Sequence, residues 1–304
     1  MLYLGTMNNK FVIARKVDKD QVLLIDFSNM SMRNLFIMPY DPLDEHFDAW
    51  KSMMIRSLRK LFREFEAGRI VFCLEGHNNW RKKVYPEYKA NRIAAREESK
   101  IDFQKFFAEQ DKFLEELKKI LCNCYFVQIE GSEADDLIAV ITKKFPKWRI
   151  TNISSDRDFY QLYKYPNYKQ YDSVKGKYIE VINPKEYLLE KVIVGDAGDN
   201  IPKIKEGIGT KRAEKILHSK EGLEEWLKLE DKEKEFQRNL TLIDFDFIPE
   251  EVQSNIFKVV NEYKLEKFNP RGLMDFLTKN KLFGFIPEIG TFATMFKRFD
   301  VCVE

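Results

Sequence analysis

Short apolar runs alternate along the first half of the chain with longer segments in which apolar residues recur at helical spacing. The runs predict strands at 22–27, 70–74, 125–129 and 148–153. The periodic segments predict helices at about 44–66 and 103–121. Strands that alternate with helices favour an α/β fold, in which a mostly parallel central sheet is flanked by helices.

After residue 187 the pattern predicts helices without strong strand signals, broken by turns at 195–209 and 245–249. We therefore expect a domain at 1–187 and a helical C-terminal domain at 188–304. Within the first domain, the apolar rhythm disappears from about 76 to 100. Basic and aromatic residues crowd there instead, namely Trp80, Arg81, Lys82, Lys83, Tyr85, Tyr88, Lys89, Arg92 and Arg96. This composition predicts an exposed basic excursion, although a merely solvated charged loop would have the same composition.

Acidic residues stand at the ends of the apolar runs and in the turns that follow. They are Asp26, Glu75, Glu133, Asp135, Asp136, Asp156, Asp158, Asp196 and Asp199. Because the carboxyl ends of parallel strands open on one crevice, we expect these carboxylates to converge. Two carboxylates about 5 Å apart repel by roughly 3 kcal/mol at an effective dielectric constant near 20. The cluster therefore predicts divalent cations with oxygen ligands, Mg2+ or Mn2+.

Helix caps are the competing explanation for these acids. A single acid after a strand is as readily a cap as a ligand. The adjacent acids from Glu133 to Asp136 would also suit the first turn of a helix, with Ser132 as its N-cap. The joint pattern, rather than any one acid, favours the metal site. The histidines His46, His77 and His218 are far apart in the chain, so no zinc constellation is predicted.

Composition adds limits rather than a function. The 304 residues are 44% hydrophobic, and 51 basic against 49 acidic residues give a formal charge of only +2. Any nucleic-acid surface must therefore arise from local segregation of basic residues. Four cysteines lack a CxxC spacing, which suits reduced thiols in a cytoplasmic protein. No segment approaches the roughly eighteen apolar residues of a membrane span.

Five ordered motifs resemble those of 5′ nucleases of the flap-endonuclease type. They are LLIDFSN from Leu23, YPEYKANR from Tyr85, EADD from Glu133, SSDRDF from Ser154 and VGDAGDNIPKIKEGIGTKRAEKIL from Val194. Within this family the chain is most similar to the ribonucleases H of T-even phages, including the segment NLTLIDFDFIPEEVQSNI near its C-terminus. The resemblance covers most of the chain and implies a PIN-like nuclease fold.

The resemblance also implies roles for the acidic residues. Around one Mg2+ it implies Asp26, Glu75, Glu133, Asp135 and Asp156, and nearer a second Mg2+ it implies Asp136, Asp158, Asp196 and Asp199. Asp135 and Asp156 would be catalytic. The acid after the second strand is usually Asp in this family, whereas this chain has Glu75. The extra methylene of Glu75 could shift the ion or leave it held through water.

For the basic excursion, the resemblance implies an arch or clamp over the active site. Lys89 and Arg92 would contact the scissile phosphate, and Arg81, Lys82, Lys83 and Tyr88 would contact DNA. A cationic gate beside anionic carboxylates would also attract a nucleic acid that bare carboxylates repel. Aromatic residues here could stack on bases or could pack a hinge.

The segment Gly207-Ile208-Gly209 resembles the hairpin of a helix-hairpin-helix element. Glycines let a phosphate approach the backbone, and the N-terminus of the next helix offers free N–H groups. We expect Gly207, Gly209, Lys211 and Arg212 to contact duplex backbone. The resemblance adds a K+ ion at this loop.

Together these features predict a Mg2+-dependent 5′ to 3′ exonuclease and flap endonuclease with ribonuclease H activity. Two metal ions about 4 Å apart would activate water and stabilise the leaving 3′ oxygen. By resemblance, the substrates are RNA primers on DNA and 5′ flaps in phage replication, and the C-terminal helices contact a phage single-strand DNA-binding protein. We expect a monomer in the host cytoplasm. The alternatives are a non-catalytic DNA-binding replication accessory, a metal-dependent phosphatase and a small-RNA toxin nuclease.

Overall fold

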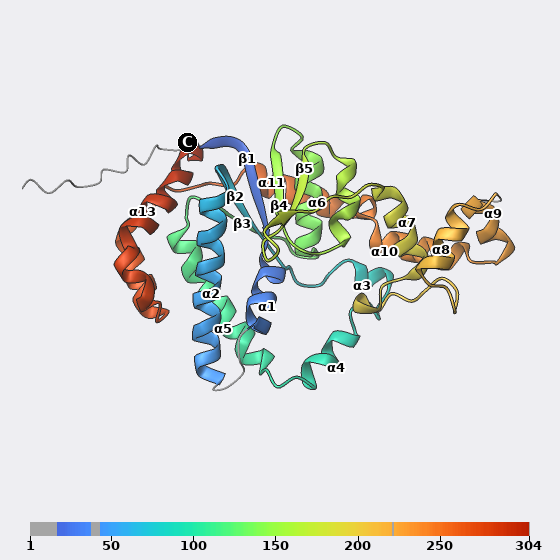
Figure 1. The fold of residues 1–304 in the computed structure, drawn as a ribbon, viewed down its shortest axis with the longest axis horizontal. Coiled ribbons are helices and arrows are strands. Elements are labelled where there is room, and N and C mark those ends of the chain that lie inside the picture. Colours follow the sequence, from blue (N-terminus) through green and yellow to red (C-terminus); the bar gives the residue numbers. More distant parts are fainter. Residues whose placement is uncertain (1–16, 38–42, 221, 304) are drawn as a thin grey trace, which may run out of the picture.

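A six-stranded sheet lies at the centre of the protein (Figure 1), with the strand order β3-β2-β1-β4-β5-β6. The computed structural model describes residues 17–37, 43–220 and 222–303. The strands are β1 (Asp18–Asp26), β2 (Ala67–Leu74), β3 (Tyr125–Gln128), β4 (Arg149–Ile153), β5 (Tyr168–Asp172) and β6 (Lys177–Tyr178). The first five run parallel and β6 pairs antiparallel with β5, which confirms the predicted mostly parallel sheet.

The first strands carry apolar residues on both faces because each face of the sheet is covered. In β1, Leu23 and Ile25 join one core, whereas Val22 and Leu24 join the core on the opposite face. Alternate residues of a strand point to opposite faces, so a strand covered on both sides shows a continuous apolar run. This covering explains why the run at 22–27 marked β1 correctly, although Phe27 already begins helix α1.

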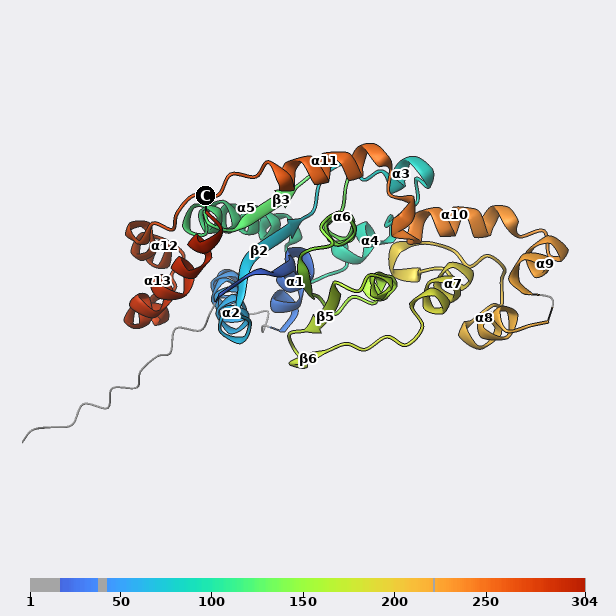
Figure 2. The same cartoon turned by 90° about the horizontal axis from the view of Figure 1, so that it is seen from above.

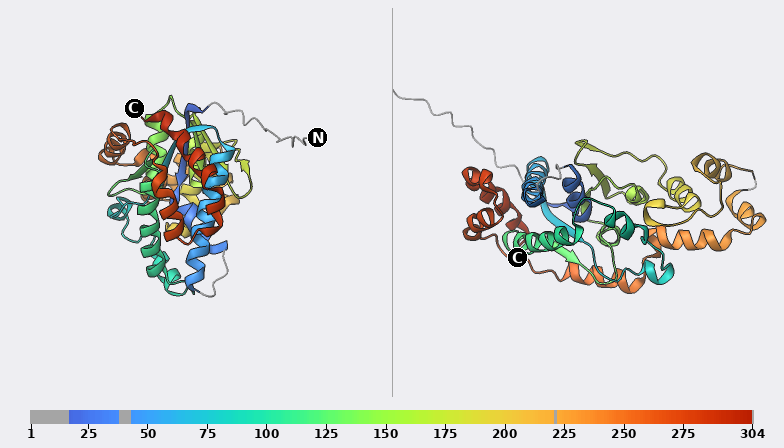
Figure 3. Two further views of the ribbon diagram at one scale, coloured as in Figure 1. Left: turned by 90° about the vertical axis from the view of Figure 1, so that its left-hand side faces the viewer. Right: turned by 90° about the horizontal axis from the view of Figure 1, so that it is seen from below.

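One face of the sheet is covered by helices from both ends of the chain. They are α1 (Phe27–Ile37), α2 (Leu43–Glu64), α5 (Phe103–Ile120), α12 (Leu273–Lys279) and α13 (Ile289–Lys297). Trp50 of α2 packs edge-on against Phe106 and Phe113 of α5, and Phe62 packs against Phe296 of α13. Figure 3 shows the C-terminal helices beside α2 and α5. The opposite face is covered by α6 (Ala134–Lys144) and α11 (Glu250–Asn261).

The remaining helices form the end of the molecule away from α12 and α13 (Figure 2). They are α7 (Pro184–Val194), α8 (Thr210–Leu217), α9 (Gly222–Leu229) and α10 (Glu233–Ile243). The boundary predicted at residue 187 falls inside α7. Beyond α10 the chain returns to the sheet, since α11, α12 and α13 share the two sheet cores. The helices that follow residue 187 therefore do not all lie apart from the sheet, because α11, α12 and α13 pack on it.

The basic excursion contains two short helices, α3 (Arg81–Val84) and α4 (Asn91–Glu97). Short 3-10 segments follow β4 at Asp158–Lys164 and follow α7 at Ala197–Asp199. Across the described ranges of the chain, no helix has the length and apolar character needed to cross a membrane.

Candidate active site

The carboxyl ends of four neighbouring parallel strands lie together, and an acidic residue stands at or after the end of each strand. Asp26 is the last residue of β1, and Glu75 directly follows β2. Glu133 immediately precedes α6, the helix after β3, and Asp156 lies three residues beyond β4. Since β3, β2, β1 and β4 are adjacent, these carboxylates converge at one edge, as the sequence predicted.

Asp26 is buried and held by donors from two elements. Its Oδ1 accepts the backbone N–H of Asn29 at 2.9 Å, and its Oδ2 accepts the hydroxyl of Ser154 at 3.1 Å. Burial, together with the nearby carboxylate of Asp156, raises the pKa of Asp26 to about 6. The same causes, with Asp26 itself as a neighbour, raise the pKa of Asp135 well above its usual range. These carboxyl groups are therefore crowded and poorly hydrated.

Glu75 is positioned by the N-terminus of α6. The backbone N–H of Ala134 donates to Glu75 Oε2 at 3.2 Å. The residue remains open to solvent at its outer surface, but protein atoms displace most of the water around its carboxylate. That loss of hydration and the nearby Glu133 raise the pKa of Glu75 to about 7. The longer side chain at this position thus still reaches the cluster.

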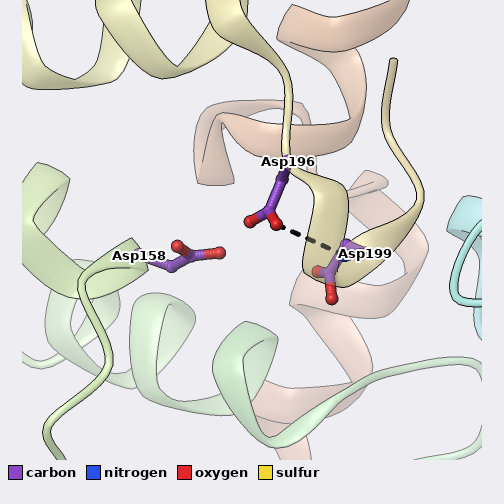
Figure 4. A group of neighbouring side chains, drawn as sticks. All are labelled: Asp158, Asp196 and Asp199. Atoms are coloured by element: carbon purple, nitrogen blue, oxygen red, sulfur yellow. Dashed lines mark hydrogen bonds between the residues drawn. The ribbon is translucent and has the colours of Figure 1, made fainter. Parts of the chain in front are cut away.

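A second group of carboxylates lies beside the first. Asp158, Asp196 and Asp199 each place an oxygen within 4.8 Å of the others (Figure 4). Asp196 caps the short 3-10 segment by accepting the N–H groups of Gly198 and Asp199. Burial and Asp156 raise the pKa of Asp158 to about 6, although a lysine opposes them. In the part of the chain that the structure describes, this is the one trio of carboxylates whose oxygens already lie within 4.8 Å of one another.

Lys191 of α7 is the lysine in this second group. Its ammonium pairs with Asp158 and lies 2.7 Å from Asp196 Oδ2. Its side chain is only 13% exposed. Lys191 was missed from the sequence, although its place three residues before the motif that begins at Val194 was a usable signal. Ser154 was missed as well, because nothing in the sequence shows that its hydroxyl reaches Asp26.

The basic excursion contributes two cations to the carboxylates. Lys89 Nζ lies 2.5 Å from Glu133 Oε1 and 3.7 Å from Asp199 Oδ2. Arg92 lies 2.6 Å from Asp199 Oδ1, and its side chain is 47% exposed. Although burial opposes ionisation of the lysine, Glu133 and Asp199 raise the pKa of Lys89 above its usual range. Both residues therefore lie where the prediction placed the clamp, beside the acids.

The donor set fits divalent cations. The two groups offer carboxylate oxygens, which are the ligands that Mg2+ and Mn2+ prefer. Burial, followed by the crowding of like charges, raises the pKa values of several of these carboxyl groups. A bound cation would relieve that repulsion. Lys89 and Lys191 partly fulfil this role in the protein alone.

Arg81 and Asp136 differ from their predicted roles. Arg81 is 2% exposed, and its guanidinium pairs with Asp136 at 2.8 Å, so it cannot contact DNA from this position. Asp136 is fully buried and also accepts the indole N–H of Trp80 at 3.1 Å. Its oxygens are therefore satisfied by protein donors and do not face the carboxylate groups. In contrast to the prediction, Arg81 here offers no surface to DNA and Asp136 offers no free oxygen to a metal ion, because the two side chains bind each other.

Two smaller predictions also differ from the structure. Tyr88 is 3% exposed, and its hydroxyl lies within hydrogen-bond distance of Glu133 and Asp199, so it does not present a ring for base stacking. The residue before α6 is Glu133 rather than Ser132, whose hydroxyl donates back to the carbonyl of Ile129. Glu133 thus caps α6 and also belongs to the carboxylate cluster.

The other predicted nucleic-acid residues are accessible. Lys82 and Lys83 are exposed on α3. In the hairpin, Gly207 has a φ of 75°, a left-handed conformation that suits glycine, and Gly209 directly precedes α8. Lys211 and Arg212 are exposed in the first turn of α8. Buried Ile208 anchors the loop in the small core of this region.

A cleft of about 530 Å³ lies beside the carboxylates. Its lining includes Asp156, Asp158 and Asp196, together with Tyr187 and Lys191 of α7. The cleft is large enough to admit a phosphate and its sugars.

Comparison with known proteins places these features in one family. Residues 21–192 match the 5′-3′ exonuclease N-terminal resolvase-like domain, and residues 182–292 match the C-terminal domain of T4 RNase H. The ribonuclease H of Enterobacteria phage T4 is 33% identical over 279 residues, which is 84% of this chain and 90% of the phage T4 protein. The flap endonuclease Xni of a Shewanella species is 27% identical over 210 residues, which is 65% of this chain and 74% of Xni.

The fold agrees with a solved structure. The flap endonuclease of bacteriophage T5, in a complex with DNA and metal ions, has a TM-score of 0.64 at 19% identity. The match covers 80% of this chain and 98% of the T5 chain. Sequence motifs, the parallel sheet and the extent of the matched domains agree, and we conclude that this chain is a nuclease of the 5′-3′ exonuclease family with the C-terminal domain of the T4 ribonuclease H branch.

Proposed function

We propose that this chain is a Mg2+-dependent nuclease that removes RNA primers and adjacent DNA from lagging-strand fragments during phage replication. It would act as a 5′ to 3′ exonuclease on RNA–DNA hybrids and as a flap endonuclease on 5′ flaps. The observation that carries the proposal is the pair of carboxylate groups at the sheet edge with Lys89 and Arg92 directly beside them. Membership of the family and the similarity to phage T4 ribonuclease H support the choice of substrate.

Eight carboxylates would hold two Mg2+ ions, with Mn2+ as a substitute. The first ion would lie among Asp26, Glu75, Glu133, Asp135 and Asp156, and the second among Asp158, Asp196 and Asp199. When bound, the ions would supply a nucleophile from water at neutral pH and neutralise charge at the leaving 3′ oxygen. Asp136 is left out of this set because its oxygens bind Arg81 and Trp80.

On substrate binding, Lys89 and Arg92 would leave their carboxylate partners and pair with a phosphate of the nucleic acid. In the protein alone they neutralise Glu133 and Asp199. A scissile phosphate in the cleft would draw both cations, which frees the carboxylates for metal ions and offsets charge that develops on the phosphoryl oxygens. Lys191, which pairs with Asp158 and Asp196 in the protein alone, would release these carboxylates in the same way.

The hairpin at Gly207 and Gly209 would bind the duplex beyond the cleft. Lys211 and Arg212 would pair with backbone phosphates without reading base sequence. A K+ ion bound at this loop would add to the attraction. Lys82 and Lys83 on α3 would contact the strand that approaches the arch.

Three parts of the sequence-based expectation remain proposals of the same kind. The protein would act as a monomer, it would work in the host cytoplasm, and its C-terminal helices would contact a phage single-strand DNA-binding protein. Among these helices, α13 packs against α2 and the residues after it contact β2, at the end of the molecule away from the hairpin (Figure 3).

The decisive test uses 5′-labelled RNA–DNA hybrid and flap substrates with Mg2+, with EDTA and with the variant Asp156→Asn. We expect short 5′ products with Mg2+ alone. Loss of one central carboxylate should reduce the rate at least about 100-fold, because the variant disturbs both ion positions. Equal cleavage by the wild type and Asp156→Asn, or cleavage that persists in EDTA, would remove the assignment. A flap substrate without a free 5′ end tests whether the cut depends on that end.

A further inference from the structure

The buried guanidinium of Arg81 joins three segments that are far apart in the sequence. Its Nη2 donates to Asp136 Oδ1 at 2.8 Å, and its Nη1 donates to Asp136 Oδ2 at 3.1 Å. Nη1 also lies 3.2 Å from Glu133 Oε2, and Nε donates to the carbonyl of Leu242 at 2.8 Å. The arch, the start of α6 and the end of α10 therefore meet at one side chain.

Asp136 fixes the orientation of that guanidinium. It forms the planar, two-bond pairing with Arg81 that lysine cannot reproduce. Its Oδ2 also accepts the backbone N–H of Glu133 at 3.0 Å and the indole N–H of Trp80 at 3.1 Å. The ring of Trp80 lies 4.5 Å from the guanidinium carbon and covers its face. With these partners, Arg81 has little freedom to move.

Arg81 and Lys89 contact different oxygens of Glu133. Oε2 receives Arg81 and lies 2.9 Å from the hydroxyl of Tyr88, whereas Oε1 faces Lys89. The side chain of Lys89 is 16% exposed, whereas that of Arg81 is 3% exposed and enclosed by its partners. One oxygen of Glu133 is thus held in place, and the other becomes available to a metal ion when Lys89 moves to a phosphate as proposed above.

We propose that Arg81, anchored by Asp136, is a positioning residue that holds Glu133 in the orientation needed to bind a divalent cation. This inference rests on the metal site of the proposed function. Arg81 would then act on Glu133 rather than on DNA. Asp136 would support this neighbouring ligand rather than bind the metal ion itself. Through the carbonyl of Leu242, the same contact ties the position of α10 to the metal site.

The test measures metal binding without nucleic acid, in the full-length chain. Mn2+ is titrated by electron paramagnetic resonance into the wild type, Arg81→Lys, Asp136→Asn and a control, Arg96→Lys. Arg96 lies in the same arch over Phe103 and Phe107, away from the carboxylates. Loss of an outer contact to a ligand typically weakens metal binding about 10- to 100-fold. We expect Arg81→Lys and Asp136→Asn to fall in that range and Arg96→Lys to match the wild type.

Cleavage and DNA binding then separate positioning from the other roles. For Arg81→Lys, the Mg2+ concentration at half-maximal rate should rise about 10-fold, and the rate at saturating Mg2+ should recover to within about 3-fold of the wild type. Affinity for a flap duplex in EDTA should not change. Trp80→Phe, which keeps the ring but removes the N–H donor to Asp136, should shift Mn2+ affinity in the same direction by a smaller factor.

Three outcomes would overturn the proposal. Unchanged Mn2+ affinity with a lowered melting temperature would make Arg81 purely structural, and the milder Trp80→Phe decides this point if Arg81→Lys does not fold. Weaker DNA binding with unchanged metal affinity would mean that Arg81 contacts DNA, as the sequence predicted. Loss of one bound Mn2+ equivalent in Asp136→Asn would make Asp136 a ligand. If the wild type itself binds no Mn2+ and cleaves nothing, the proposed function fails rather than this inference.

Discussion

Lys89 adopts a backbone conformation that is rare for residues other than glycine. Its φ is 59°, in the left-handed region that costs roughly 1–2 kcal/mol for such residues. The backbone N–H of Lys89 donates to the carbonyl of Asp199 at 2.9 Å, which offsets part of that cost. Strain of this kind persists where the surroundings fix the residue, and here it directs the ammonium toward Glu133 and Asp199.

The variant Lys89→Ala tests the clamp at the level of one side chain. We expect the cleavage rate at saturating substrate to fall about 100- to 1,000-fold, because a preorganised cation beside the reacting phosphate is lost. Duplex binding should persist, since the hairpin cations remain. Lys82→Ala is the contrasting variant: it should leave the rate at saturation unchanged and reduce the salt dependence of binding by about one unit. Unchanged turnover in Lys89→Ala would discard the clamp role.

Gly76 offers a stability test next to the site. A Cβ at this position would lie 1.9 Å from the carbonyl oxygen of Ile129 and 2.8 Å from that of Ser132. The loop between β3 and α6 would have to move, so we expect Gly76→Ala to lower the free energy of unfolding by about 2–4 kcal/mol. Gly290→Ala in α13 is the control, because nothing lies within 4 Å of its Cβ and the change should stay under about 1 kcal/mol. Urea unfolding of both variants measures the difference.

At the level of elements, the base of the arch docks on the loop that carries Asp196 and Asp199. Asn200 donates through its side chain to the carbonyl of Glu87 at 2.7 Å. From the other side, Asn91 donates to the carbonyl of Ala197, also at 2.7 Å. The two carboxamides therefore clip together the segments that carry the clamp cations and the second carboxylate group.

Removal of either clip should loosen the arch. Asn200 has a φ of 58°, so Asn200→Gly removes the carboxamide without adding backbone strain, whereas Asn200→Ala adds about 1 kcal/mol of strain. We expect Asn200→Gly and Asn91→Ala to be cut by trypsin within residues 82–96 several-fold faster than the wild type. Asn200→Ala should show the same cleavage and a lower melting temperature. Proteolysis at the wild-type rate in both clip variants would mean that other contacts hold the arch.

The elements that the sequence predicted correctly are those with a strong periodic signal. The central strands are apolar on both faces, and α2 and α5 show long helical spacing. Strands β5 and β6 were missed because they lie toward an edge of the sheet and contain Lys169, Asp172 and Lys177. Polar residues are tolerated near an edge, so the pattern there does not differ from that of a loop.

At the level of the whole molecule, the sequence predicted that the acids lie together at the carboxyl ends of the strands. It did not predict which side chain each acid would contact. Convergence follows from the topology of parallel strands. Whether a given acid faces the cleft or a buried arginine depends on how the arch packs against α6 and α10, which no local pattern encodes. Arg81 and Asp136 are charged residues in motifs with other charged residues. Only the structure shows that both are buried and form a salt bridge with each other.

The packing of the acids also makes the stability of the metal-free protein depend on pH. The folded-state pKa values of Asp26 and Asp158 are raised to about 6 and that of Glu75 to about 7. Between the unfolded values near 4 and these folded values, the folded state binds more protons than the unfolded state. The free energy of unfolding must therefore decrease as pH rises through this window. Below it, the groups are protonated in both states and the effect is absent.

We therefore expect the melting temperature in EDTA to fall by about 5 °C between pH 5 and pH 8, after allowance for the partial solvent exposure of Glu75 and Asp158. Glu75→Gln should flatten this dependence, because it removes the carboxyl group with the highest of these pKa values. With excess Mg2+ the decrease should disappear, since a bound cation stabilises the ionised carboxylates and binds the folded state selectively. Scanning calorimetry across this pH range makes the measurement. A melting temperature in EDTA that is constant or rises toward pH 8 would mean that the folded protein tolerates these charges without a metal ion.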